Sequence, residues 1–216
     1  MAIAFDAVST GGAVATSLTI AHTCTGSDRI LYAYLNTNFG TDFAVTATYN
    51  GVPMTAVSNL QNSSASGRLY DFYLINPASG TNNIVFTPNA SANMNSVNAS
   101  YTGVRQSAQP DASGTTSAAT ASGATRTLTF TTIADNCWQI SGTHGGGDLP
   151  NASTGFTSRA TEGNGRLGDS NAALTPAGSK SMSITNSGAG TISLSMVGIS
   201  ISPAIPGLAG NFFMFM

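Results

Sequence analysis

The sequence predicts an all-β protein: an antiparallel β-sandwich of jelly-roll or immunoglobulin-like type, with about 11–13 strands and an extended C-terminal tail. Short runs alternate between inward and outward positions, as Leu18, Ile20 and His22 do along one predicted strand. Gly, Asn, Ser and Pro separate these runs, and the chain has only one Lys and one Glu, so two strong helix formers are nearly absent. Alternation and composition together favour strands throughout the chain.

The alternation predicts eight strands before a polar stretch and five after it. They cover residues 2–7, 17–23, 29–36, 44–49, 53–57, 68–75, 83–87 and 96–103, then 125–131, 137–144, 155–159, 181–184 and 191–202. Asn50-Gly51 is a preferred type I′ turn pair because both positions take a positive φ, so it predicts a hairpin between residues 44–49 and 52–57. Residues 76–80 and 187–190 carry the small and turn-forming residues of two further turns.

The stretch at residues 104–124 is small and polar, which is typical of a domain linker or of a long crossover on the surface of one sandwich. We favour the crossover, because five strands are few for an independent core, whereas two packed sheets of about six strands suit the whole length. We therefore expect a single β-sandwich domain over residues 1–203 and a separate tail over residues 204–216.

The tail ends in a cluster of large apolar residues without a charge. Its members are Phe212, Phe213, Met214, Phe215 and Met216. Such a cluster would promote aggregation if it stayed in water, so it must be covered. Either it is the final strand of the core, or it binds another chain; we assign these five residues to an interaction with another chain.

Charge is scarce along the 216 residues. Charged residues make up 7 % of the chain and the formal net charge is −2, against about 25 % charged residues in an ordinary soluble domain. A chain with so weak a field is not expected to bind nucleic acid or an anionic membrane surface. Its beginning resembles no secretory signal and no run is long enough to span a bilayer, so we expect synthesis in the cytoplasm.

Catalytic groups do not form a recognisable set. His22 is in phase with Leu18 and Ile20, which predicts a structural histidine, and His144 opens a His-Gly-Gly-Gly sequence like the oxyanion loop of esterases. The matching Gly-x-Ser-x-Gly nucleophile turn does not occur. We therefore predict no catalytic residues, no cofactor and no enzymatic activity.

The acidic residues and cysteines predict no metal site. Glu162 is the only Glu, and Asp135, Asp148 and Asp169 suit turns and caps better than an acid–base pair or a calcium loop. Two cysteines, Cys24 and Cys137, are too few for a zinc site. They are either two buried thiols or one disulfide.

Aromatic residues leave a binding role open. Tyr32 and Tyr34 share one face of a predicted strand, where they either stack on a sugar or line the core, and Trp138 is predicted to anchor the core. A sugar site would combine these rings with loops at residues 145–150 and 162–169. Flat Thr/Ala-rich faces would suit ice binding, but we expect no regular Thr-x-Thr repeat.

Several turn and strand sequences resemble a recurrent unit of phage and metagenomic proteins. They are Phe5-Asp6-Ala7, residues 18–23 and 26–31, Thr48-Tyr49-Asn50-Gly51-Val52-Pro53-Met54, residues 73–81, and Ala99-Ser100-Tyr101-Thr102-Gly103-Val104 followed by Gln109-Pro110. The resemblance spans residues 4–203 and implies a β-sandwich module of tailed-phage virion proteins and some bacterial surface proteins. These motifs are turns and strands, so the resemblance implies a scaffold and no catalytic residues.

The resemblance and the composition together lead to a non-enzymatic virion structural protein. We expect a capsid-decoration or other auxiliary protein of a bacteriophage that forms a homo-oligomer or binds other virion or capsid proteins. The alternative is a module that binds a surface glycan or another host receptor. No nucleic acid, membrane, cofactor or metal is expected as a partner.

Overall fold

The computed structural model describes residues 1–205, and all its regular elements are β-strands. The first nine are β1 (Ala4–Ala15), β2 (Leu18–Cys24), β3 (Ile30–Thr37), β4 (Thr46–Tyr49), β5 (Val52–Pro53), β6 (Thr55–Gln61), β7 (Arg68–Ile75), β8 (Gly80–Thr87) and β9 (Ala92–Thr102). The rest are β10 (Ala112–Thr120), β11 (Thr125–Thr132), β12 (Trp138–Gly145), β13 (Asn151–Ala152), β14 (Thr157–Glu162), β15 (Gly165–Asp169), β16 (Gly178–Thr185) and β17 (Ile192–Ile201). The all-β prediction is confirmed; within the described range, no helix could span a membrane.

The strands form four antiparallel sheets, two in each half of the chain. In the first half, the N-inner sheet has the order β1-β9-β3-β7-β6 and the N-outer sheet the order β2-β8-β4-β5. In the second half, the C-inner sheet has the order β10-β17-β12-β15-β14 and the C-outer sheet the order β11-β16-β13. Each half thereby has the strand order of a jelly roll, with the strand after the fourth crossing to the edge of the inner sheet. We call the halves the N-roll and the C-roll.

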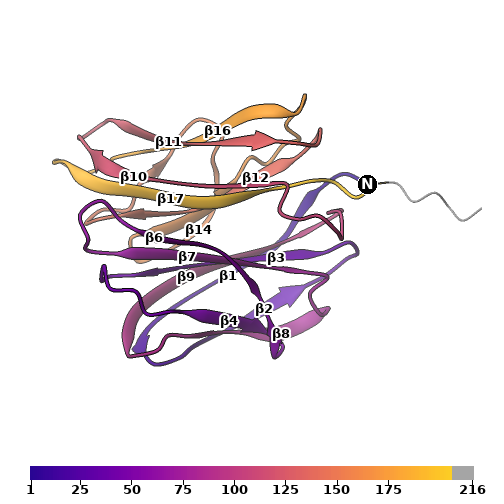
Figure 1. Cartoon of the computed structure of the whole chain (residues 1–216), viewed down its shortest axis with the longest axis horizontal. Coiled ribbons are helices and arrows are strands. Elements are labelled where there is room, and N and C mark those ends of the chain that lie inside the picture. The colour runs from indigo at the N-terminus through magenta and orange to yellow at the C-terminus, as the bar shows by residue number, and fades with distance from the viewer. Residues whose placement is uncertain (206–216) are drawn as a thin grey trace, which may run out of the picture.

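The four sheets stack as layers, with the two inner sheets face to face at the centre (Figure 1). Three apolar cores separate them. The N-outer core includes Phe72 and Phe86, the central core includes Tyr32 and Ile199, and the C-outer core includes Phe130. Inner-sheet strands such as β3 and β12 are buried on both faces, because each inner sheet packs against two neighbouring layers.

The two rolls are structural repeats of each other. Strands β1, β2, β3, β4, β6, β7, β8 and β9 occupy the same places in the N-roll as β10 to β17 occupy in the C-roll. The sixth of these strands opens on the same sequence pattern in both rolls, Gly67-Arg68-Leu69-Tyr70-Asp71 and Gly165-Arg166-Leu167-Gly168-Asp169. This Gly-Arg-Leu-x-Asp pattern is the sequence signal of an internal duplication that our sequence analysis missed.

Contacts between the two inner sheets follow the same symmetry. Strand β1 contacts β14 just as β10 contacts β6, and β9 contacts β15 just as β17 contacts β7. Each of these contacts is thus matched by one with the rolls exchanged, and matched contacts of this kind are typical of an isologous dimer. The chain therefore resembles a two-fold dimer built within a single polypeptide.

The local predictions succeed where a turn has a specific requirement. Asn50 and Gly51 take φ values of 49° and 75°, and together they join β4 to β5. The predicted hairpin is confirmed only beside this turn, because residues 55–57 belong to β6 of the N-inner sheet. The polar stretch at residues 104–124 differs from the prediction, because it contains the nine-residue strand β10, which pairs with β17 along its whole length. The 17 strands within residues 1–205 exceed the predicted number partly for that reason.

Candidate functional site

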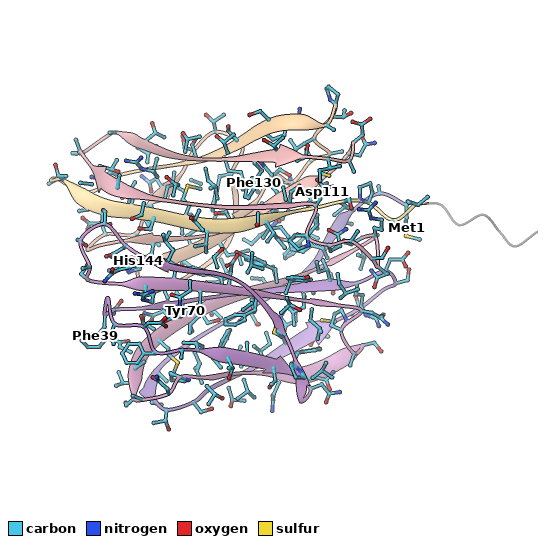
Figure 2. The ribbon with its side chains drawn as sticks, in the orientation of Figure 1. Met1, Phe39, Tyr70, Asp111, Phe130 and His144 are labelled. Atoms are coloured by element: carbon cyan, nitrogen blue, oxygen red, sulfur yellow. The ribbon has the colours of Figure 1, made fainter. Side chains whose placement is uncertain are left out.

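An apolar cavity of about 470 Å³ opens at the end of the molecule where Met1 and Pro203 lie. Figure 2 shows Met1 at this end, with His144 and Phe39 toward the opposite end. The cavity is lined by Met1, Ala2, Ile3, Asn136, Trp138, Ala173, Pro203 and Ala204. None of these side chains is charged, and seven are apolar with two rings among them, so the cavity suits an apolar group. We refer to it as the Trp138 cavity.

The segment before β1 is fixed against the chain beyond β17. The Met1 nitrogen donates a hydrogen bond to the Ala204 carbonyl at 3.1 Å. Gly103 has a φ of 69°, and a Cβ on it would overlap the Ala2 carbonyl oxygen, so only glycine allows this close approach. Residues from three distant parts of the sequence therefore meet at one wall of the Trp138 cavity.

Trp138 is supported from inside the molecule by a row of rings. Its indole is 8 % exposed and lies edge-on to Tyr101 at 6.1 Å between ring centroids. Tyr101 in turn meets Phe5 at 6.0 Å, and the Arg159 guanidinium lies 4.2 Å from the Phe5 ring centroid. This packing holds the Trp138 ring in place and leaves its remaining exposed edge to the cavity.

A buried ion pair closes the same row. Arg159 donates to both carboxylate oxygens of Asp169 at 2.7 and 2.8 Å, and the Tyr101 hydroxyl donates to Asp169 at 2.8 Å. Asp169 is fully buried, so these bonds replace the water that its carboxylate loses on folding. The group is structural, because Tyr101 and Asp169 are fully buried and their polar atoms are used in these bonds.

The predicted interaction residues Phe212, Phe213, Met214, Phe215 and Met216 lie outside the described residues 1–205. The last described residues, however, place the start of that segment. Ala204 lines the Trp138 cavity and Ile205, directly after it, is 71 % exposed. Sequence reasoning identified Trp138 as a core anchor but could not place it beside the chain that leads into the tail.

Of the two alternatives for Tyr32 and Tyr34, the sugar-stacking platform is wrong. Tyr32 and Tyr34 are both fully buried between the inner sheets. The Tyr32 hydroxyl donates to Asp71 at 2.9 Å, and the Tyr34 hydroxyl donates to the Thr143 carbonyl at 2.8 Å. A sugar cannot reach either ring, so the core alternative is the one that holds.

Both histidines are buried, as predicted for His22. Burial lowers the pKa of His22 to about 4, partly opposed by Asp6, and burial lowers the pKa of His144 to about 4. Both imidazoles are therefore neutral at pH 7. His22 Nδ1 bonds the Ser9 hydroxyl at 2.9 Å, but the buried His22 Nε2 has no hydrogen-bond partner among residues 1–205. No third group therefore orients this imidazole as a general base.

The remaining titratable residues do not gather into a site. Among residues 1–205, no three His, Cys, Asp or Glu side chains lie close enough together to hold a metal ion. Cys24 and Cys137 are free and buried, so the disulfide alternative is wrong. Burial raises the pKa of the Cys137 thiol to about 11, with Asp111 adding to the shift, and burial also raises the pKa of Cys24. Protonated thiols of this kind are poor nucleophiles.

The two loops predicted to form a binding site do meet. The Gly145 amide donates to the Asn164 carbonyl at 3.1 Å, and the Arg166 guanidinium donates to the Pro150 carbonyl at 2.9 Å. None of the three predicted rings is open to these loops. Tyr32 and Tyr34 are fully buried, although Tyr34 lies beside Gly165, and Trp138 lines the cavity at the Met1 end. The proposed combination of loops and rings therefore does not exist.

The expectation that a Thr-x-Thr repeat is missing is wrong. Four exposed threonines, Thr125, Thr127, Thr129 and Thr131, follow one another on the outer face of β11. Two of their hydroxyls pair with serines of β16, Thr127 with Ser183 at 2.9 Å and Thr129 with Ser181 at 3.0 Å. The row is one strand wide, and the strand preference of threonine is enough to account for it.

The comparisons with known proteins were negative: no family model, curated protein or solved structure matches the chain. The strongest feature is the Trp138 cavity, which can bind apolar side chains and which adjoins the segment leading to the apolar tail.

Proposed function

We propose that the protein is a non-enzymatic structural protein of a phage virion, a capsid-decoration or auxiliary component that assembles with further copies of itself. Assembly takes place through the end of the molecule that carries the Trp138 cavity. The opposite end and the outer sheets then face solvent or neighbouring proteins. The fold contributes stiffness and surface, and no reaction.

The architecture supports this proposal in two ways. Jelly rolls are recurrent in capsid and lectin proteins, although a fold by itself is only an analogy for function. Four stacked layers with three apolar cores make a rigid body. With 7 % charged residues, its contacts should depend little on ionic strength.

The single observation that carries the proposal is the coincidence at one end of the molecule. The Trp138 cavity, the exposed side chains of Met1 and Ile205, and the start of the tail occur together there. Exposed apolar surface of this kind marks a protein–protein contact site. Many copies on a particle would add avidity to a weak single contact.

The proposal is tested by comparing the full chain with a variant lacking residues 211–216. Sedimentation velocity over a range of concentrations should show association of the full chain and a monomer for the variant, with the same thermal unfolding for both. In a matched pair of full-length variants, Phe213→Asp should abolish association and Asn211→Asp should not. A full chain that stays monomeric at its highest soluble concentration overturns the proposal, as does a shortened chain that still associates.

A second candidate function, glycan binding, is favoured by one groove. A polar groove of about 480 Å³ lies on the outer face of the N-outer sheet. It is lined by Thr48, Asn50, Gly51, Thr81, Asn82, Asn83 and Val85. Hydroxyl and amide groups without a charge suit a neutral sugar better than an ionic ligand.

A glycan array and calorimetry with the full chain test this candidate. A neutral glycan should bind, and Asn83→Ala should weaken that binding about tenfold, corresponding to one lost hydrogen-bonding side chain. Thr129→Ala, on the opposite outer sheet, serves as the control. Failure of every neutral glycan to bind would remove the candidate.

A further inference from the structure

We infer that the Trp138 cavity of one copy receives the apolar segment at residues 212–216 of a second copy, and that two copies exchange these segments reciprocally. This inference rests on the proposed function and names both partners of the contact. The proposed function says only that copies assemble. The inference adds which site accepts, which segment is inserted, and that the assembly is a two-fold dimer.

The acceptor has the chemistry of a pocket for apolar anchors. Its volume of about 470 Å³ lies within the roughly 300–1,000 Å³ typical of ligand pockets. The side chains of Ile3, Trp138 and Pro203 line it, and no charged side chain does. Asn136 is the one polar side chain in this lining, so the cavity favours an occupant that is mostly apolar.

The donor has the matching composition. Residues 212–216 read Phe-Phe-Met-Phe-Met, with no polar side chain among them. Aromatic side chains are common anchors at the centre of protein interfaces. A methionine sulfur also packs favourably against an aromatic ring such as that of Trp138.

The distance along the chain suits an exchange. Ala204 lines the cavity, and Phe212 follows it by eight residues. An extended chain spans about 3.3–3.6 Å per residue, so Phe212 can reach at most about 29 Å from Ala204. Two copies that meet at their Met1 ends would bring each donor within reach of the other copy's cavity. A reciprocal exchange between two such ends is an isologous contact, which closes on a two-fold axis.

A second copy accounts for the exposed residues better than the same copy does. Met1 is 63 % exposed and Ile205 is 71 % exposed at this end. A segment that returned to its own cavity would cover the Met1 side chain, which lines the cavity, but not Ile205, which does not line it. Two ends that meet cover the cavities, Met1 and Ile205 in one contact, which removes more apolar surface from water.

The first test blocks the Trp138 cavity and leaves the apolar segment at residues 212–216 unchanged. Ala173 is an exposed residue lining the cavity, and its neighbour Ala172 is exposed but does not line it. In full-length protein, Ala173→Arg should weaken association roughly tenfold or more, because the guanidinium occupies the apolar pocket. Ala172→Arg adds the same charge one residue away and should associate like the parent chain.

Mixing experiments identify the occupant. Ala173→Arg keeps its donor segment, and Phe213→Asp keeps its cavity, so each alone should be monomeric. Mixed and labelled with different fluorophores, they should form heterodimers through one intact donor–acceptor pair. Trp138 is the only tryptophan in the chain, so its emission should shift to shorter wavelength as the heterodimer forms.

The outcomes separate this inference from the proposed function. If Ala173→Arg associates normally while loss of residues 211–216 abolishes association, the tail-mediated assembly stands and the Trp138 cavity is not its acceptor. If the chain is monomeric and loss of the tail shifts Trp138 emission to longer wavelength, the segment occupies its own cavity and the exchange is overturned. If the shortened chain associates like the full chain, the proposed function and the inference both fall.

Discussion

The two rolls have the same strand order but very different outer cores. Between the sheets of the N-roll, 17 buried apolar residues form one cluster, whereas 7 fill the corresponding space in the C-roll. Phe43, Tyr49, Phe72 and Phe86 give the first core several large rings. The second core has Phe130 and Phe156 as its only rings.

This difference shows that the strand order tolerates a small outer core when other contacts are present. Serine and threonine hydroxyls pair across the C-outer sheet, and Gln139 and Asn186 donate to backbone carbonyls nearby. Such bonds add about 1 kcal/mol each, less than a buried aromatic ring. We therefore expect the C-outer sheet, β11, β16 and β13, to be the least stable layer of the molecule.

The largest expected effect comes from removing one phenylalanine from each outer core. Phe86→Ala and Phe130→Ala should each cost about 3–5 kcal/mol, because both rings are buried. In the small C-outer core, the loss of Phe130 should also detach the sheet, and β11 and β16 amides should exchange with solvent before global unfolding. Calorimetry together with hydrogen exchange checks both statements. Equal protection of β8 and β16 in the two variants would contradict the comparison.

The next largest loss of stability is expected at one of the two aspartates of the Gly-Arg-Leu-x-Asp repeat. Asp169 is paired with Arg159, whereas Asp71 has no cation beside it among residues 1–205. Arg159→Gln should cost about 3 kcal/mol, because it leaves a buried carboxylate without its counter-charge. Chemical denaturation measures this cost. Arg105→Gln is the control, since Arg105 bonds only carbonyls of its own exposed loop, and a loss of similar size there would contradict the assignment.

The fold could be predicted from the sequence where local chemistry decides the structure. The alternation at residues 17–23 places Leu18, Ile20 and His22 inward, and all three are buried in β2. The Asn50-Gly51 turn follows from its demand for positive φ. Strand β10 could not be predicted in this way, because Ser, Thr, Ala and Gly carry no apolar alternation. It forms because β17 offers it a complete ladder of backbone partners.

The candidate site could be predicted only in part. The apolar tail stands out in the sequence, but the Trp138 cavity is assembled from residues far apart in the chain, such as Ile3, Trp138 and Pro203. Tyr32 and Tyr34 alternate with residues that are also buried, so their pattern could not tell an exposed platform from a central layer. That central layer exists because two rolls pack together, and only the Gly-Arg-Leu-x-Asp repeat could have indicated two rolls.

At Asp71, in contrast, a substitution is expected to stabilise the folded protein, by less than the losses above. Burial raises its pKa to about 6, although the Tyr32 hydroxyl bond opposes the shift. The folded protein thus favours the protonated acid, so this group's contribution to stability is greatest below about pH 4 and is lost as pH rises through 6. Asp71→Asn resembles the protonated form at every pH and should stabilise the protein by about 1–3 kcal/mol at pH 7.5. Denaturation at pH 4 and 7.5 checks this, and a pH-independent difference would contradict it.

The smallest effect tests the duplication itself. Arg68 donates to the Gly40 carbonyl at 3.1 Å and to Asn59 at 2.7 Å; Arg166 donates to the Pro150 carbonyl at 2.9 Å and to Ser158 at 2.8 Å. Each arginine thereby ties the loop after the third strand of its roll to the fifth strand. Arg68→Ala and Arg166→Ala should each cost about 1 kcal/mol. The costs should add in the double variant, because the two sites share no partner. A large loss of stability in one variant and none in the other would mean that the two arginines do not have the same structural role in the two rolls.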